Sequence, residues 1–144
     1  GVIVGIVDAS LAMMSAVVAA ESCGLGTCCI GYTRTAAPRE ISEILKLPKG
    51  VYCVCGLAIG IPRETPDLKP KQPTSLVIHQ NHYRTDNLTN DLLDYDSTVT
   101  HFNANRSGTK SDNDWAAHIV DYYRIAMDYK MLQALQDSGY DITR

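Results

Sequence analysis

Residues 8–26 read DASLAMMSAVVAAESCGLG, and from Ala9 to Cys23 this stretch is apolar on nearly every side of a predicted helix. Asp8 is suited to be the N-cap, and Gly24 is suited to end the helix at the C′ position. A helix that is apolar all round has to be buried, and its many alanines permit close backbone approach. The residues alone leave two places for it, the core of the chain or a seam between two subunits.

After this helix the sequence predicts strands interleaved with helices, which is typical of an α+β or α/β protein. The expected strands cover residues 27–33, 51–61 and 76–79, and the expected helices cover residues 38–47, 88–103 and a segment capped by Ser111. Val51–Ile61 is almost continuously apolar and is expected to be a central strand covered on both faces. Pro62–Pro73 holds four of the six prolines and is expected to be an extended loop. The helix after Ser111 carries a stripe that is expected to be buried, namely Trp115, Ile119, Tyr122, Ala126 and Tyr129.

Length and composition predict one globular domain over residues 1–144, with 45% hydrophobic and 20% charged residues. A net charge of −3 argues against general nucleic-acid binding, which needs a basic face to neutralise phosphates. The longest uncharged apolar run, Ala9–Ala20, has twelve residues, whereas a bilayer needs about 20. No membrane span and no signal peptide are therefore expected.

The sequence contains five cysteines whose spacing does not resemble a secreted disulfide framework: Cys23, Cys28, Cys29, Cys53 and Cys55. The histidines lie far from them and no C-x-x-C pattern is present, so no metal site is expected. We expect buried, apolar thiols in a reducing cytoplasm.

Two basic segments carry the chemistry that the residues indicate, since no complete catalytic motif is present. In Lys69-Pro70-Lys71 the proline stiffens the backbone, so that two ammonium groups can be held near a phosphate. Arg106 begins a flexible basic loop, residues 106–110, of a kind that can also grip a phosphate. Solvated surface charges are the simpler interpretation of each segment, whereas together they indicate a phosphorylated ligand.

Several blocks, in this order and spacing, resemble the nitroreductase family. They are AAESCGLG at residues 19–26, ILKLP at 44–48, GLAIG at 56–60 and PDLKP at 66–70. The later segments, HQNHY at residues 79–83 and residues 106–115, resemble the branch of NADPH-dependent nitroreductase A and flavin reductase P. The likeness runs through nearly the whole chain but covers only the C-terminal part of a usual member. We therefore expect a chain truncated at the N-terminus.

The resemblance implies an α+β nitroreductase fold and a cytoplasmic homodimer that holds FMN at the subunit interface. The helix Asp8–Cys23 would pack across the dimer axis, which favours the seam between subunits. Family enzymes transfer hydride from NAD(P)H to FMN and then pass electrons to a small molecule, such as a nitroaromatic compound, a quinone or a free flavin.

The same resemblance implies seven cofactor-binding residues: Cys29, Ile30, Gly31, Tyr32, Lys69, Lys71 and Arg106. The first four would lie beside the isoalloxazine ring, where backbone amides are offered to it. The two lysines would face the ribityl phosphate of FMN, and the arginine would meet the 2′-phosphate of NADPH. The sequence indicates no catalytic side chain.

The sequence departs from the family pattern at several points. Tyr32 stands where glycine is frequent and could crowd the flavin ring, Lys71 stands where arginine is usual, and Ser111 replaces a second arginine. The N-terminal segment that grips the FMN phosphate in the family is absent from the 144 residues. Two alternatives to a flavin oxidoreductase therefore stay open. One is an impaired remnant that dimerises without stable flavin, and the other is a module that binds a different phosphorylated ligand.

Overall fold

The computed structural model describes residues 1–126 and 131–141. They form two compact units, of which the first contains Gly1–Arg63 and the C-terminal residues and the second begins at Glu64 and contains α4, α5 and α6. The elements are α1 (Val2–Ser22), β1 (Gly26–Ile30), α2 (Tyr32–Thr35), α3 (Pro38–Ile44), β2 (Gly56–Gly60), α4 (Thr74–Val77), α5 (Leu88–Asn105), α6 (Trp115–Ala126) and α7 (Met131–Asp137). The mixture of helices and sheet confirms the α+β class, and the assignment of all 144 residues to one domain stays a prediction.

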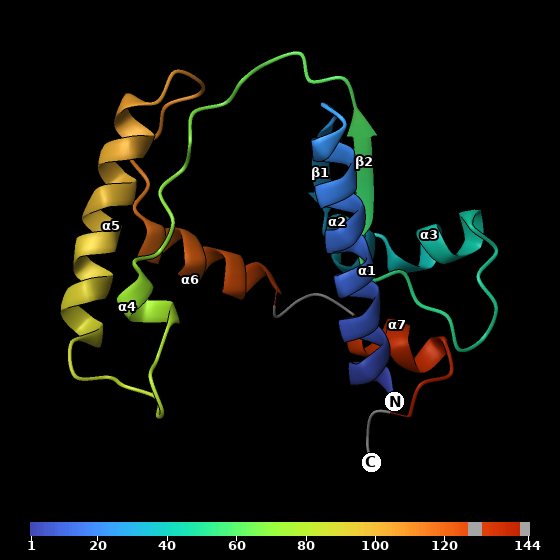
Figure 1. The fold of residues 1–144 in the computed structure, drawn as a ribbon. Coiled ribbons are helices and arrows are strands. Elements are labelled where there is room, and N and C mark those ends of the chain that lie inside the picture. The colour runs from blue at the N-terminus through green and yellow to red at the C-terminus, as the bar shows by residue number, and fades with distance from the viewer. Residues whose placement is uncertain (127–130, 142–144) are drawn as a thin grey trace. The chain divides into compact units, whose positions relative to one another are not determined.

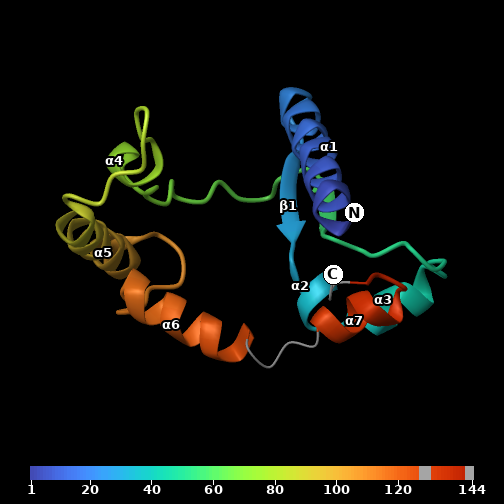
Figure 2. The ribbon, with the colours of Figure 1, turned by 90° about the horizontal axis from the view of Figure 1, so that it is seen from below.

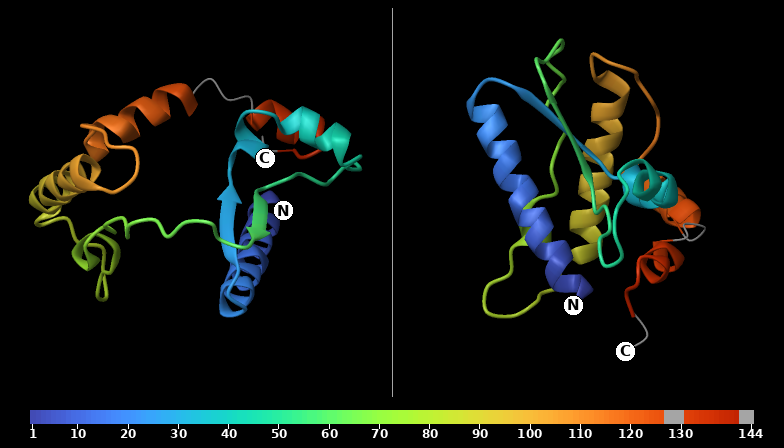
Figure 3. Two further views of the ribbon diagram at one scale, coloured as in Figure 1. Left: turned by 90° about the horizontal axis from the view of Figure 1, so that it is seen from above. Right: turned by 90° about the vertical axis from the view of Figure 1, so that its right-hand side faces the viewer.

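The first unit is built on an antiparallel pair of strands. β1 and β2 pair from Gly26 opposite Gly60 to Ile30 opposite Gly56. Helix α1 lies beside β1 (Figures 1 and 2), and the short helices α3 and α7 lie side by side (Figure 2 and Figure 3, left). The pairing leaves the end of β1 leading directly into α2, where the sequence predicts flavin contacts.

Three helices of this unit end in the same backbone arrangement. In α1, the Gly24 amide donates to the Glu21 carbonyl at 3.0 Å and the Leu25 amide donates to the Ala20 carbonyl at 3.1 Å. This Schellman arrangement needs a left-handed residue, and Gly24 has φ +76°. The left-handed residue after α7 is Gly139, with φ +93°, and the one after α3 is Lys46, with φ +51°. The prediction that Gly24 ends the first helix is confirmed.

The second unit consists of α4, α5 and α6, with α5 in contact with both of the others (Figure 1). Tyr95 and Val99 of α5 are buried, and the Tyr95 ring meets Trp115 edge-on, with ring centroids 5.5 Å apart. Asp96 of α5 also accepts the Ala116 amide of α6 at 2.8 Å. An aromatic contact and a hydrogen bond therefore join these two helices at the start of α6.

The first helix begins earlier than predicted. It starts at Val2, so that Asp8 lies inside α1 rather than capping it. The apolar residues before Asp8 continue the helix, which is long and apolar enough, by length and composition alone, to cross a membrane. Its side chains are not buried within the chain as a core helix would be, since Leu11 is 63% exposed and Val18 is 57% exposed.

Two of the three strand predictions need correction. β1 confirms the strand expected over residues 27–33 as far as Ile30, after which Tyr32–Thr35 is the helical turn α2. Val51–Ile61 is not a buried central strand, because only Gly56–Gly60 is paired and Ile59 is 51% exposed. Among the described residues β2 has one neighbour, β1, so it is an edge strand and not a central one. Residues 76–79 do not form a strand, because Thr74–Val77 is a helical turn that follows Pro73 and contacts α5. Pro73 has no N–H and a fixed φ, which suits a position just before a helix.

The helix predictions are confirmed for residues 38–47 by α3 and for residues 88–103 by α5. The cap of α6 is Asp114 rather than Ser111, because Asp114 Oδ1 accepts the Ala117 amide at 2.6 Å. The Ser111 amide instead donates to the Asn103 carbonyl of α5 at 3.1 Å.

The expected burial is wrong at several side chains. In the predicted stripe Tyr122 is 45% exposed, and Tyr129 lies outside the described residues. The cysteine thiols are also less buried than expected, because Cys23, Cys28 and Cys29 are exposed.

Candidate functional site

A cavity of about 190 Å³ in the second unit brings together two of the predicted phosphate-binding residues, Lys69 and Arg106. It lies where the extended proline-rich segment passes the end of α5 and the start of α6. The remaining lining residues are Val99, Asn103, Ser111, Asn113, Asp114, Trp115 and His118. Lys71 is exposed and is not among the residues that line this cavity.

Lys69 lies on a segment that hydrogen bonds hold on both sides of it. The Tyr95 hydroxyl donates to the Pro70 carbonyl at 3.3 Å, and Tyr95 itself is buried against Trp115. Two residues before the lysine, Asp67 Oδ2 accepts the Ser107 amide at 2.6 Å. These contacts place the backbone at Lys69, while its ammonium group has no carboxylate partner among the described residues.

Arg106 is the C-cap residue of α5, where its amide donates to the Phe102 carbonyl at 2.9 Å. Its Nε donates to the Thr109 carbonyl within the same loop. In the described part of the chain, neither terminal nitrogen of the guanidinium has a hydrogen-bond acceptor or a carboxylate partner. The side chain is therefore oriented through Nε, with its two NH₂ groups available to an anion.

The donors around this cavity fit a phosphate group. Lys69 and Arg106 line it together with Asn103, Ser111 and His118, whereas Asp114 is the carboxylate in its lining. That carboxylate already accepts the Ala117 amide at the start of α6. A volume of about 190 Å³ suits the phosphate end of a nucleotide, because pockets for whole cofactors are about 300–1,000 Å³.

The other predicted residues lie in the first unit, where β1 ends and α2 begins. Cys29 and Ile30 are the exposed last residues of β1, Gly31 is the N-cap of α2, and Tyr32 is 69% exposed. Both carbonyls at this turn are bonded, since the Thr33 hydroxyl donates to Ile30 at 3.1 Å and the Thr35 hydroxyl to Gly31 at 3.4 Å. The turn thus presents an exposed aromatic ring next to a glycine.

Sequence reasoning missed a cation at this turn, Arg34, which packs against Gly31. A Cβ built on Gly31 would lie 3.1 Å from Arg34 Nη1, and this nitrogen donates to the Val54 carbonyl at 3.2 Å. The Tyr52 hydroxyl donates to the Arg34 carbonyl at 3.0 Å. Burial raises the pKa of Tyr52, and the charge of Arg34 acts in the opposite direction. A Cβ at position 31 would therefore require the end of the Arg34 side chain, three positions later in the sequence, to shift.

Asp67 is the second missed residue. The Ser107 backbone amide, and after it the Ser107 hydroxyl, lower the pKa of this exposed carboxyl group. Asp67 is therefore ionised at neutral pH. Its position two residues before Lys69 was the one signal in the sequence, while its partner lies 40 residues away.

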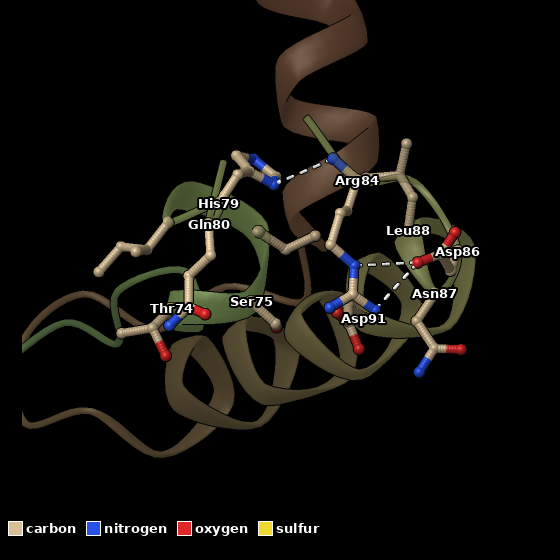
Figure 4. A pocket seen from close by; sticks show the side chains of 11 residues that line it. Thr74, Ser75, His79, Gln80, Arg84, Asp86, Asn87, Leu88 and Asp91 are labelled. Atoms are coloured by element: carbon tan, nitrogen blue, oxygen red, sulfur yellow. Dashed lines mark hydrogen bonds and ion pairs between the residues drawn. The ribbon is translucent and has the colours of Figure 1, made fainter. Parts of the chain in front are cut away.

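A larger cavity of about 770 Å³ lies between α4, the following loop and the start of α5 (Figure 4). Arg84 crosses it to an ion pair with Asp86 at 3.0 Å, and the Arg84 amide donates to His79 Nδ1 at 3.3 Å. The His79 ring also lies 4.3 Å from the Tyr83 ring. Arg84 and Asp86 of this cavity thus pair with one another, and Asp91 is a further carboxylate in its lining. Within residues 1–126 and 131–141, no group of three or more His, Cys, Asp or Glu is arranged to hold a metal ion.

Comparison with known proteins matches both parts of the chain to one family. Residues 3–61 match the sequence profile of the nitroreductase family, and residues 69–143 match the profile of the nitroreductase family C-terminal domain. The chain belongs to the nitroreductase family. The boundary between the two nitroreductase matches falls at the same place as the boundary between Arg63 and Glu64 that separates the two units.

Individual nitroreductase relatives agree with this assignment. The chain is 36% identical to the FMN reductase [NAD(P)H] of Bacillus subtilis (strain 168) over 144 residues, 99% of this chain and 57% of the relative. It is 39% identical to the Cr(VI) reductase of Pseudomonas sp. (strain G-1) over 121 residues, 84% of this chain and 49% of the relative.

Among solved structures, the hypothetical oxidoreductase YcnD from Bacillus subtilis superposes with a TM-score of 0.90 at 36% identity, over 98% of this chain and 57% of that one. The expected nitroreductase fold is therefore confirmed. The chain spans about half the length of the relatives it matches.

Proposed function

We propose that this chain is part of an FMN-dependent NAD(P)H oxidoreductase that reduces a small-molecule acceptor in the cytoplasm. The observation that carries the proposal is the cavity that Lys69 and Arg106 line together, where neither side chain has a carboxylate partner among the described residues. Family membership supports it, as does the name of the Bacillus subtilis relative, an FMN reductase [NAD(P)H].

In this proposal the chain's own residues bind and orient, and FMN, when bound, supplies the chemistry of accepting hydride and passing electrons on. Lys69 and Lys71 hold the ribityl phosphate, and Arg106 holds the 2′-phosphate of NADPH. The turn Cys29–Tyr32 lies along the isoalloxazine ring, where the exposed Tyr32 ring limits the space left for the acceptor.

We further propose that the active form is a homodimer joined through the helix Asp8–Cys23. The supporting observation is the exposure of large apolar side chains along this part of α1, for example Leu11 at 63% and Val18 at 57%. Apolar surface of this extent is stabilised when it is removed from water, by about 25 cal/mol per Å².

The binding proposal is tested by titrating the purified chain with FMN and with riboflavin, which lacks the phosphate, and by following NADPH consumption. We expect tighter binding of FMN than of riboflavin. Lys69→Ala and Lys71→Ala should each weaken FMN about ten- to a hundred-fold, the value of one charged hydrogen bond, and leave riboflavin unchanged. Lys49→Ala, an exposed lysine of the first unit, is the control. A folded dimer that binds no flavin would contradict the proposal and support an impaired remnant.

A further inference from the structure

One hydrogen bond joins the two segments that carry the cations of the 190 Å³ cavity. Asp67 Oδ2 accepts the Ser107 amide at 2.6 Å across a sequence separation of 40 residues. Asp67 stands two residues before Lys69, and Ser107 follows Arg106 directly. The bond therefore connects the proline-rich segment to the loop after α5 at the point where each presents its charge.

The rest of the cavity fixes Lys69 on one side only. The Tyr95–Pro70 hydrogen bond secures the segment after the lysine, and the buried Tyr95 ring makes that end stiff. Before the lysine, residues 61–69 are exposed and have no regular secondary structure. Asp67 supplies the contact on that side.

Electrostatics alone would not favour a carboxylate here. Asp67 is ionised at neutral pH, and a negative charge close to Lys69 and Arg106 reduces the attraction of their site for an anion. A carboxylate here favours anion binding only if the ordering of the two segments that it provides outweighs the repulsion between its negative charge and the anion.

We propose that Asp67 is a positioning residue, whose bond to the Ser107 amide holds Lys69 beside Arg106 at one cavity before the phosphate of FMN binds to Lys69. The inference rests on the proposed function, since that function supplies the phosphate. Ordering two exposed segments in advance lowers the conformational entropy that binding has to overcome. Asp67 touches neither cofactor nor substrate in this arrangement.

The test compares FMN with riboflavin in Asp67→Ala. We expect the preference for FMN over riboflavin to fall about three- to ten-fold while riboflavin affinity stays unchanged. Asp67→Asn keeps an oxygen acceptor for the Ser107 amide and should retain part of the preference. A general loss of structure would weaken both flavins alike, so the ratio separates positioning from folding.

The control is Asp86→Asn, which removes an exposed aspartate of the same unit that pairs with Arg84 and not with the cavity. It should leave the FMN preference unchanged. If Asp67→Ala binds FMN as tightly as the wild type, or more tightly, the positioning role is wrong. Removal of the negative charge of Asp67, which repels the phosphate, would then account for the result.

The outcome for Asp67 is separable from that for the proposed function. A wild-type chain that prefers FMN, with the same preference in Asp67→Ala, overturns only the positioning role. If the wild type binds no flavin, the proposed function fails, and inorganic phosphate becomes the probe in a titration followed through the Ser107 amide by NMR. Phosphate binding that Asp67→Ala weakens supports the positioning role, and binding that is absent or unchanged overturns it.

Discussion

At the scale of single residues, one carboxylate joins α3 to α7. Asp137 Oδ2 accepts from Arg39 Nε at 3.1 Å and from Arg39 Nη2 at 2.5 Å, while Oδ1 accepts from Gln133 Nε2 at 2.9 Å. The Gln133 hydrogen bond, followed by that of Arg39, lowers the pKa of Asp137. The C-terminal helix of this nitroreductase chain is thus held by a group that responds to acid.

Asp137→Asn is expected to lower stability at neutral pH and to have progressively less effect in acid. Because the folded-state pKa lies below the unfolded value of about 3.9, the stabilisation is present above that value and is lost as pH falls through the folded pKa. Urea unfolding at pH 7 and in steps below pH 4 measures it. Asp121→Asn, which breaks the Arg124 pair within α6, is the control. A difference from wild type that persists at the lowest pH would show that the charge of Asp137 is not involved.

At the scale of secondary-structure elements, the helix ends of the first unit rely on left-handed residues. Gly24 and Gly139 have no Cβ and adopt positive φ without cost, whereas Lys46 reaches φ +51° with a side chain attached. The same arrangement therefore occurs twice with the favoured residue and once with a strained one.

Substitutions at two of these helix ends should change the free energy of unfolding in opposite directions. Gly24→Ala should lower the free energy of unfolding by about 1 kcal/mol, because a Cβ there meets no atom within 4 Å and backbone strain is the only penalty. Lys46→Gly should raise it by about 0.5 kcal/mol, since relief of strain is partly offset by the entropy of glycine in the unfolded chain. Urea unfolding followed by circular dichroism measures both. If both variants raise or both lower the free energy of unfolding, left-handed backbone strain does not decide the stability of these helix ends.

At the scale of the whole molecule, α1 is apolar on all sides and yet little of it is covered by the chain. Ala20 is its buried residue within the described range, close to the end where the helix meets β1. A helix with this composition needs a partner surface, and in the proposed homodimer that surface is the same helix of a second copy.

We expect light scattering to give twice the mass of one chain for the wild type. Leu11→Asp places a charge on the exposed face of α1 and should shift the protein toward the monomer, because an unpaired buried charge is costly. Leu68→Asp is the control, since Leu68 is 96% exposed and lies outside α1. A monomeric wild type, or equal effects of both variants, would exclude this interface.

Local signals made several elements predictable. Pro38 at the first turn and apolar residues on one face predicted α3, and Gly24 predicted the end of α1. Each of these depends on residues within a few positions of one another. The ordered family blocks also identified the family, because their order and spacing are properties of the sequence itself.

Partners far apart in the sequence were not predictable. The apolar run Val51–Ile61 contains no information on how many strands lie beside it, so its burial was misjudged. Asp114 caps α6 in place of Ser111, because the Ser111 amide donates a hydrogen bond to the Asn103 carbonyl of α5.

For this protein the amino-acid sequence by itself determined the family, the main helices and the residue types suited to a phosphate, because short-range propensity and motif order act along the chain. Only the tertiary structure decided that Lys69 and Arg106 line one cavity while Lys71 lies outside its lining, and that Asp67 bonds to Ser107. The physical reason is that such contacts depend on how α5 and the proline-rich segment pack, and packing energy is shared among residues that no local pattern connects.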